Sequence, residues 1–222
     1  QSLELIERLQ KQMPELKFVV GGPEVSFEEE GSLAFPVLSG EGEKKWVEFL
    51  ELTGKNETPS DEVLKRWRTY GTDLPELIPA YQEEDYPELK NRIVYFETSR
   101  GCPYLCSFCL SALDKTVRYF DESLIQNQIK ELLNNGIQKI KFVDRTFNLK
   151  PKRMKELMEW LSQFKGNEFH FEVVGDILTP EILNFLKTVP SGMFQFEIGI
   201  QTTTESVQET IQRKQSNQKL FE

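Results

Sequence analysis

The stretch "RIVYFETSRGCPYLCSFC", residues 92–109, joins an apolar strand pattern to a loop that holds every cysteine of the chain. Cys106 follows Cys102 by four residues, and Cys109 follows Cys106 by three. An odd number of cysteines in one window, with none elsewhere, argues against a disulfide framework and for a reducing compartment. We therefore expect a cytoplasmic protein that uses these thiols for metal binding.

Three thiolates on one loop suit a [4Fe–4S] cluster, which is normally held by four. Three thiolates would leave one iron open to a further ligand, and the loop follows a strand, where βα folds place their chemistry. Gly101 permits the tight backbone that wrapping a cluster requires. Two other readings remain: buried structural cysteines, and a Cys₃His zinc site that uses His170, the only histidine of the sequence.

The composition excludes several classes of protein. Hydrophobic content of 38% and charged content of 28% are ordinary for a soluble chain of 222 residues. No apolar run approaches the length of a membrane span. The formal net charge of -9 makes non-specific binding to nucleic acid unfavourable, because clustered Lys and Arg supply most affinity for phosphates.

From residue 91 onward the pattern alternates between strand and helix. Each intervening helix has a start signal, which is Asp121 or Thr179 as N-cap or Pro151 in the first turn. Such βα units imply parallel strands, in a barrel or in an open doubly wound sheet. The strands are expected at 92–99, 138–144, 168–174 and 194–201.

The last two of these strands favour the barrel. They alternate between an apolar and a polar face, whereas the central strands of a doubly wound sheet are apolar on both faces. A closed (β/α)₈ barrel would in turn fill its interior with branched apolar residues. We therefore expect an incomplete barrel with a ligand inside.

Residues 1–55 have the pattern of a further α/β domain. One strand ends at Gly21-Gly22-Pro23, and a second ends in the glycine turn "GEGE" before a helix. Residues 56–90 carry scattered Pro, Gly and acidic residues, which predicts a linker between this domain and the barrel at 91–222. The chain has no initiator Met and no leader pattern, so we expect that it is cut at both ends.

The cysteine spacing, with Phe108 just before Cys109 and the loop placed after the first strand, resembles the radical S-adenosylmethionine superfamily. The resemblance implies a partial (β/α)₆ barrel, of which about four units are present. It also implies that Cys102, Cys106 and Cys109 bind a [4Fe–4S] cluster whose open iron is chelated by S-adenosylmethionine, and that Phe108 lies beside this cofactor. One electron from the cluster then produces a 5′-deoxyadenosyl radical.

The two glycine turns of residues 1–55 resemble the C-terminal end of the Rossmann-like cobalamin-binding domain that precedes the barrel in one branch of this superfamily. The resemblance places Gly21 and Gly22 beside the nucleotide tail of cobalamin. An ordinary nucleotide-fold turn is the other reading. The whole arrangement is most similar to proteins related to the anaerobic magnesium-protoporphyrin monomethyl ester oxidative cyclase.

The resemblance also implies residues that contact S-adenosylmethionine. An acid on the third strand, a Gln at the end of the fourth and an Arg twelve residues later correspond to Glu172, Gln201 and Arg213. Asp144 stands where the family has a small-residue turn for the methionine ammonium, although "VDRTFN" departs from the glycine-rich form. Arg213 can alternatively lie on a solvated helix.

These observations predict a radical enzyme, as a cobalamin-dependent methyltransferase or an oxidative cyclase, with a small molecule or peptide as substrate and flavodoxin or ferredoxin as electron donor. A structural zinc module is the alternative from another class. A tRNA methylthiotransferase shares the cysteine loop but adds a second cysteine set and a basic RNA-binding module that this sequence lacks. We expect the isolated chain to be inactive, to bind no cobalamin and to self-associate through the strand at 194–201.

Overall fold

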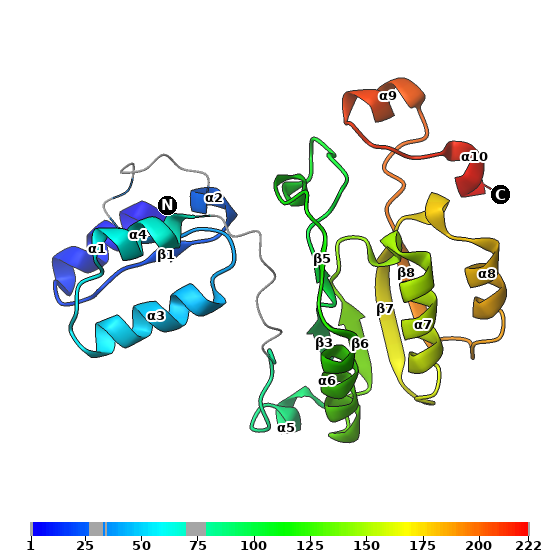
Figure 1. Ribbon diagram of the computed structural model, residues 1–222, viewed down its shortest axis with the longest axis horizontal. Coiled ribbons are helices and arrows are strands. Elements are labelled where there is room, and N and C mark those ends of the chain that lie inside the picture. The colour runs from blue at the N-terminus through cyan, green and yellow to red at the C-terminus, as the bar shows by residue number, and fades with distance from the viewer. Residues whose placement is uncertain (1, 27–32, 34, 70–78, 222) are drawn as a thin grey trace. The chain divides into compact units, whose positions relative to one another are not determined.

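The protein is described from a computed structural model that covers residues 2–26, 33, 35–69 and 79–221. The chain divides into two compact units, residues 1–75 and 76–222 (Figure 1). The second unit contains a four-stranded parallel sheet, as the sequence predicts. Its strands are, in spatial order, β3 (Ile93–Phe96), β6 (Lys139–Phe142), β7 (Glu168–Val173) and β8 (Phe194–Ile198).

Helices alternate with these strands along the chain (Figure 1). They are α6 (Glu122–Asn134), α7 (Pro151–Leu161) and α8 (Pro180–Leu186). The predicted start signals are confirmed, because the Asp121 carboxylate accepts from the backbone N–H groups of Ser123 and Leu124, and the Thr179 hydroxyl accepts from that of Ile182. Pro151 is the first residue of α7.

The two faces of the sheet differ, as expected from the alternation. On one face the aromatic rings of Phe142 and Phe171 stack with centroids 4.8 Å apart, and both side chains are fully buried. This face and the helices form the core, with buried side chains that include Ile125, Ile129, Leu132, Met154, Leu157, Met158 and Leu161. The other face carries the charged side chains Lys141, Glu172 and Glu197.

Shorter elements frame the edge of the sheet where the strands end. Strands β4 (Ser99–Arg100) and β5 (Arg118–Tyr119) form an antiparallel ribbon. The 3₁₀ turns η1 (Leu110–Leu113), η2 (Phe147–Leu149) and η3 (Gly175–Ile177) follow the loop or the strands, and the chain continues into α9 (Glu205–Thr210) and α10 (Asn217–Phe221). None of the helices in the described residues is long and apolar enough to cross a bilayer.

The first unit consists of short elements around a small core. They are α1 (Ser2–Gln12), β1 (Val20–Gly21), α2 (Pro23–Ser26), β2 (Val37–Leu38), α3 (Glu43–Gly54) and α4 (Asp61–Arg68). Strands β1 and β2 pair in parallel over two residues each, so they are shorter than their apolar runs suggest. The core joins Leu38 and Phe49 to the fully buried Trp67 of α4.

The segment expected to be a linker, 56–90, is divided between the units. Its helix α4 contributes Trp67 to the core of the first unit, where the indole Nε1 donates to Glu48 at 2.7 Å. Its helix α5 (Tyr86–Leu89) contributes the buried Tyr86, whose hydroxyl donates to Glu131 of α6 at 2.9 Å. Large aromatic side chains thus anchor both ends, and residues 70–78 lie outside the described residues.

Candidate functional site

The cysteine loop lies between β4 and β5, which pair Ser99 with Tyr119 and Arg100 with Arg118. Gly101 opens the loop with φ +89, and a Cβ at this position would lie 2.1 Å from the carbonyl oxygen of Thr116. Because both the backbone conformation and the space exclude a side chain, the first step of the loop requires glycine.

The three cysteines line one cavity of about 220 Å³. Cys102 and Cys106 are buried and Cys109 is exposed, and all three thiols are free. A turn brings the last two together, since the Cys109 N–H donates to the Cys106 carbonyl at 3.0 Å. Phe108, predicted to lie beside the cofactor, also lines this cavity while 55% of its surface is exposed. We call this space the cysteine cavity.

The ends of β7 and β8 supply the opposite wall of the cysteine cavity. Three residues predicted to bind S-adenosylmethionine, Glu172, Gln201 and Arg213, line it together with the cysteines. Gln201 adopts φ +65, a left-handed conformation that is uncommon outside glycine and that often marks a functional site. Residues distant in sequence therefore meet at one site.

Arg213 is held by several groups, so it is not a freely solvated helix residue. Its Nη2 donates to the Gly199 carbonyl at 2.7 Å, its Nη1 lies 3.8 Å from the Cys106 Sγ, and its guanidinium lies over the Tyr104 ring. Within the described part of the chain, the buried Nε of Arg213 has no hydrogen-bond partner. This nitrogen remains a donor for an anionic group of a ligand.

The carboxylates of the cavity are held by Lys141. Its Nζ lies 2.9 Å from Glu197 and 3.5 Å from Glu172. The hydrogen bond from Lys141 and its charge hold the pKa of Glu197 below its ordinary value. Glu197 therefore presents negative charge to the cavity at neutral pH.

The residues required by the zinc reading do not gather. His170 Nε2 lies 3.4 Å from the Glu197 carboxylate, and His170 is not among the residues that line the cysteine cavity. Among the described residues, no three side chains of His, Cys, Asp or Glu converge on a position for one metal ion. The three cysteines nevertheless line one cavity.

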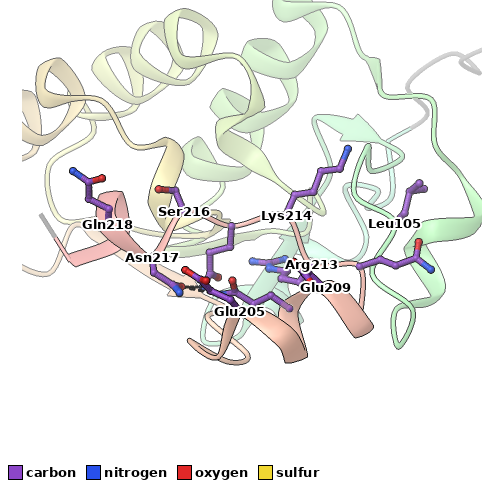
Figure 2. Close-up of a pocket in the computed structure, with 11 residues that line it drawn as sticks. Leu105, Glu205, Glu209, Arg213, Lys214, Ser216, Asn217 and Gln218 are labelled. Atoms are coloured by element: carbon purple, nitrogen blue, oxygen red, sulfur yellow. Dashed lines mark hydrogen bonds between the residues drawn. The ribbon is translucent and has the colours of Figure 1, made fainter.

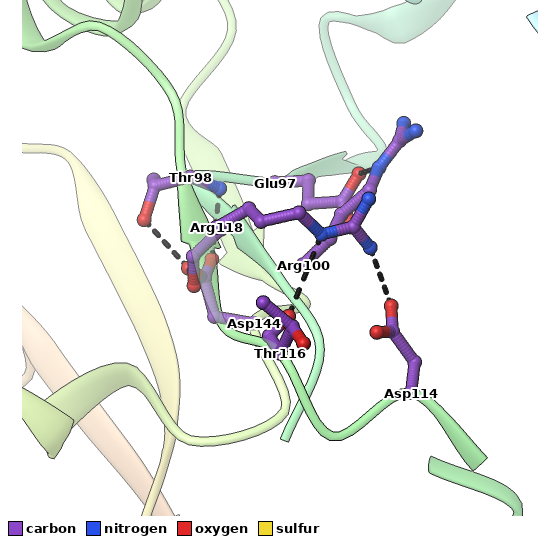
Figure 3. Close-up of polar contacts among 8 residues, drawn as sticks. Glu97, Thr98, Arg100, Asp114, Thr116, Arg118 and Asp144 are labelled. Atoms are coloured by element: carbon purple, nitrogen blue, oxygen red, sulfur yellow. Dashed lines mark hydrogen bonds and ion pairs between the residues drawn. The ribbon is translucent and has the colours of Figure 1, made fainter. Parts of the chain in front are cut away.

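Asp144 lies outside the cysteine cavity and contacts Thr98 (Figure 3) and Ser99, at the start of the cysteine loop. We call these three residues, together with Asn148, the frame of the loop. It is fully buried and accepts from the Thr98 N–H at 2.9 Å, the Thr98 hydroxyl at 2.6 Å and the Ser99 hydroxyl at 2.5 Å. Burial raises the pKa of Asp144, and these hydrogen bonds oppose the shift. Asp144 is therefore not brought together with the other predicted ligands, and its contact with the methionine ammonium stays a prediction.

Sequence reasoning missed several residues of the site, chiefly in the segment after β6. Arg145 and Thr146 line the cavity, and the Thr146 Oγ1 lies 3.8 Å from the Cys102 Sγ. The buried Asn148 exchanges two hydrogen bonds with the backbone of Val174, at 2.7 and 2.9 Å. Their position at the carboxyl end of a strand was the available signal.

A second cavity, of about 640 Å³, adjoins the C-terminal helices (Figure 2). Leu105 of the cysteine loop and polar side chains such as Glu205, Glu209 and Asn217 line it. Arg213 lines both cavities.

Gly21 and Gly22 belong to the first unit, at the end of β1. Gly22 has φ +96, and a Cβ on Gly21 would lie 3.3 Å from the Leu38 carbonyl oxygen. Both positions therefore favour glycine for backbone reasons, which is compatible with either reading of this turn.

Comparison with known proteins assigns the family. The model of the radical SAM superfamily matches residues 96–222. This range includes the cysteine loop and the four predicted site residues after it, which are Asp144, Glu172, Gln201 and Arg213. The chain belongs to the radical SAM superfamily. The cofactors of this family are a [4Fe–4S] cluster and S-adenosylmethionine, as predicted.

Two curated relatives of this radical SAM chain are described as methyltransferases. Uncharacterized methyltransferase PH0819 of Pyrococcus horikoshii is 28% identical over 205 residues, which cover 76% of this chain and 44% of that protein. The cobalamin-dependent radical SAM methyltransferase TokK of Streptomyces tokunonensis is 33% identical over 73 residues, 32% of this chain and 11% of that protein. The predicted relation to the cobalamin-dependent branch is confirmed, whereas the likeness to the cyclase stays a prediction.

A solved structure supports the fold. The radical S-adenosylmethionine methyltransferase TsrM of Kitasatospora setae, solved with tryptophan and an analogue of S-adenosylmethionine, superposes with a TM-score of 0.62 at 14% identity. The match covers 96% of this chain and 47% of TsrM. The chain spans less than half the length of PH0819 and of TokK. The mixed α/β fold with a partial barrel is thereby confirmed.

Proposed function

We propose that this chain carries the S-adenosylmethionine-cleaving site of a cobalamin-dependent radical methyltransferase. One observation carries the proposal: Cys102, Cys106 and Cys109 share a cavity with Glu172, Gln201 and Arg213. These two groups of residues are about 60 to more than 100 positions apart in sequence, and each was expected to bind one half of the same cofactor pair. The family model supports this pairing.

The residues fit a cluster and its cosubstrate. Cys102, Cys106 and Cys109 would ligate three irons of a [4Fe–4S] cluster. When bound, the cluster supplies the electron for reductive cleavage of S-adenosylmethionine, and the protein contributes binding and orientation. The donor of that electron is proposed to be a flavodoxin or ferredoxin.

The side chains of the cavity have separate parts in binding. The free Nε of Arg213 donates to the methionine carboxylate, and Glu172 accepts from the ribose hydroxyls or the ammonium. Gln201, fixed in its left-handed conformation, adds an amide at the end of β8. Phe108 adds an aromatic ring to the wall of the cavity beside Cys109.

Methyl transfer is proposed over oxidative cyclisation because both curated relatives are described as methyltransferases. TokK is also described as cobalamin-dependent, which supports cobalamin as a cofactor of the whole protein. In this proposal Gly21 and Gly22 line the path of the nucleotide tail. The acceptor of the methyl group is a small molecule or a peptide.

Anaerobic reconstitution with iron and sulfide tests the proposal. We expect about four irons per chain and an EPR signal from the one-electron-reduced cluster, because three thiolates suffice to hold it. Replacement of any one of the three cysteines by Ala should abolish this signal while the circular dichroism stays that of the parent. Ser107→Ala, which changes an exposed residue of the same loop, is the matched control. Stoichiometric zinc without a cluster would favour the structural zinc module instead.

A further inference from the structure

Thr146 stands beside a cysteine but is outside the set of residues that sequence motifs indicate. Its Oγ1 lies 3.8 Å from the Cys102 Sγ, and the two side chains are 4% and 7% exposed. The same hydroxyl donates to the carbonyl oxygen of Arg145 at 2.7 Å. Thr146 lines the cysteine cavity and is held by the turn that follows β6. Water therefore competes little for this contact.

Ligation of iron by Cys102 would decide which way the contact runs. A free thiol can donate to the Thr146 oxygen, and the Thr146 proton then stays on the Arg145 carbonyl. A cysteine that ligates iron has lost its proton, so its sulfur can only accept. Rotation about the Cβ–Oγ1 bond is sufficient to turn the threonine proton from the carbonyl to the sulfur.

We propose that Thr146 donates a hydrogen bond to the Cys102 thiolate and thereby raises the reduction potential of the cluster. The inference rests on the proposed function, since it requires the cluster on the three cysteines. Reduction adds negative charge that is shared by the ligating sulfurs, so a donor to sulfur stabilises the reduced form more than the oxidised form. Hydrogen bonds to sulfur are among the features that set the potentials of iron–sulfur clusters.

Thr146 differs in this respect from Arg213, the other donor near a thiol. Arg213 Nη1 lies 3.8 Å from the Cys106 Sγ, but Arg213 also binds the Gly199 carbonyl and is proposed to bind the methionine carboxylate. A change at Arg213 would therefore alter cosubstrate binding and the potential together. No part in cosubstrate binding is proposed for Thr146, whose other hydrogen bond goes to the Arg145 carbonyl, so its effect on the potential can be measured without S-adenosylmethionine.

The test is a redox titration of the reconstituted chain, monitored by EPR in the absence of S-adenosylmethionine. Thr146→Val keeps the shape of the side chain and replaces the hydroxyl with a methyl group, which removes the donor to sulfur and the hydrogen bond to the Arg145 carbonyl. At a fixed ambient potential we expect the ratio of reduced to oxidised cluster to fall about tenfold, which for a one-electron couple is about 59 mV. Thr146→Ser should keep the parent ratio. Thr116→Val, which changes an exposed threonine of the same loop, is the matched control.

The outcomes separate this inference from the proposed function. An unchanged potential in a Thr146→Val protein of full iron content overturns the inference and leaves the proposed function intact. If Thr146→Val assembles no cluster, hyperfine spectra of the parent and Thr146→Ser proteins in H₂O and D₂O decide. An exchangeable proton at hydrogen-bond distance from the Cys102 sulfur supports the inference, and its absence overturns it. Failure of the parent itself to hold a cluster overturns both.

Discussion

The end of β6 and the ends of β7 and β8 carry acidic side chains at the same edge of the sheet, yet the structure uses them differently. Asp144 is fully buried, and its oxygens accept three hydrogen bonds from Thr98 and Ser99. Glu172 and Glu197 are partly or largely exposed and face the cysteine cavity. The difference teaches that a carboxylate can bind a ligand only where the protein has not already supplied all its donors.

A second buried contact of the frame links the turn after β6 to the end of β7. Asn148 pairs its amide with both backbone groups of Val174, at the end of β7. The turn after β6 therefore binds two neighbours: Asp144 contacts the residues before the cysteine loop, and Asn148 contacts the end of β7. This frame is rigid because its polar groups are buried and paired, whereas the Arg213 Nε at the cavity has no partner among the described residues and is left for a cofactor.

The largest effect on the free energy of unfolding is expected when Asp144, the acid of the frame, is removed. Asp144→Ala should lower the free energy of unfolding by about 3 kcal/mol, because it leaves a buried N–H and two buried hydroxyls without an acceptor. Glu172→Ala, on the open side of the comparison, should cost less than about 1 kcal/mol. Urea denaturation gives both values, and hydrogen exchange of the β3 and β6 amides shows whether the loss begins at the loop.

Equal costs for these two variants would break the comparison. That result would mean that Asp144 has no special place in the frame, and its predicted contact with the cosubstrate would regain support. The same titrations should include the cluster content, since a loosened loop base would also release the three cysteines.

The second effect concerns the glycine that starts the loop. Gly101→Ala forces a side chain into a left-handed backbone conformation and within 2.1 Å of the Thr116 carbonyl oxygen. Gly192 has a similar φ of +84, but nothing lies within 4 Å of the position that a Cβ would take there, so Gly192→Ala is the matched control. We expect about 1 kcal/mol for the control and at least about 2 kcal/mol for Gly101→Ala, with loss of cluster content only in the latter.

Similar thermal midpoints and similar iron content for the two alanine variants would count against the steric argument. The loop would then have room to move its carbonyl at little cost. In that case the cysteines are positioned by their own contacts and not by the ribbon of β4 and β5.

Much of this architecture could be predicted from the sequence. Capping residues, apolar stripes and strand alternation are local signals, and the cysteine spacing is specific enough to indicate the cofactor. The sequence could not show which acids are paired within the fold and which remain available to a ligand. That depends on the donors that reach Asp144 from Thr98 and Ser99, 46 and 45 residues away in sequence. For Thr146 and Asn148 the sequence offered only their position after a strand, which does not distinguish a threonine that reaches a thiol from one that reaches solvent.

The third effect should appear in binding and not in stability. Glu172→Gln in the cluster-loaded protein should weaken S-adenosylmethionine binding about tenfold, because an amide lacks the charge that attracts the ammonium. Glu168→Gln is the control, since Glu168 lies at the opposite end of β7 and pairs with Lys139 at 2.8 Å. Equilibrium dialysis measures both. Unchanged affinity in Glu172→Gln would remove this residue from the proposed ligand set.

The smallest effect is expected at Glu197, which shares Lys141 with Glu172. Its side chain is 57% exposed, so water and salt screen the ion pair, and Glu197→Gln should cost less than about 0.5 kcal/mol at neutral pH.

Lys141 lowers the pKa of Glu197 from the ordinary value of 4.5. A lowered pKa stabilises the folded state above pH 4.5, and this contribution is lost as the pH falls through the lowered value. Urea denaturation at several pH values should therefore show the small difference between parent and variant disappearing in acid, and also in about 1 M salt, where the screening length is short. The difference between the parent and Asp144→Ala should survive the same salt, because its hydrogen bonds are buried. A Glu197 effect that is large and insensitive to salt would mean that this carboxylate stabilises the fold as Asp144 does. Glu197 would then belong to the frame and not to the residues available to a ligand.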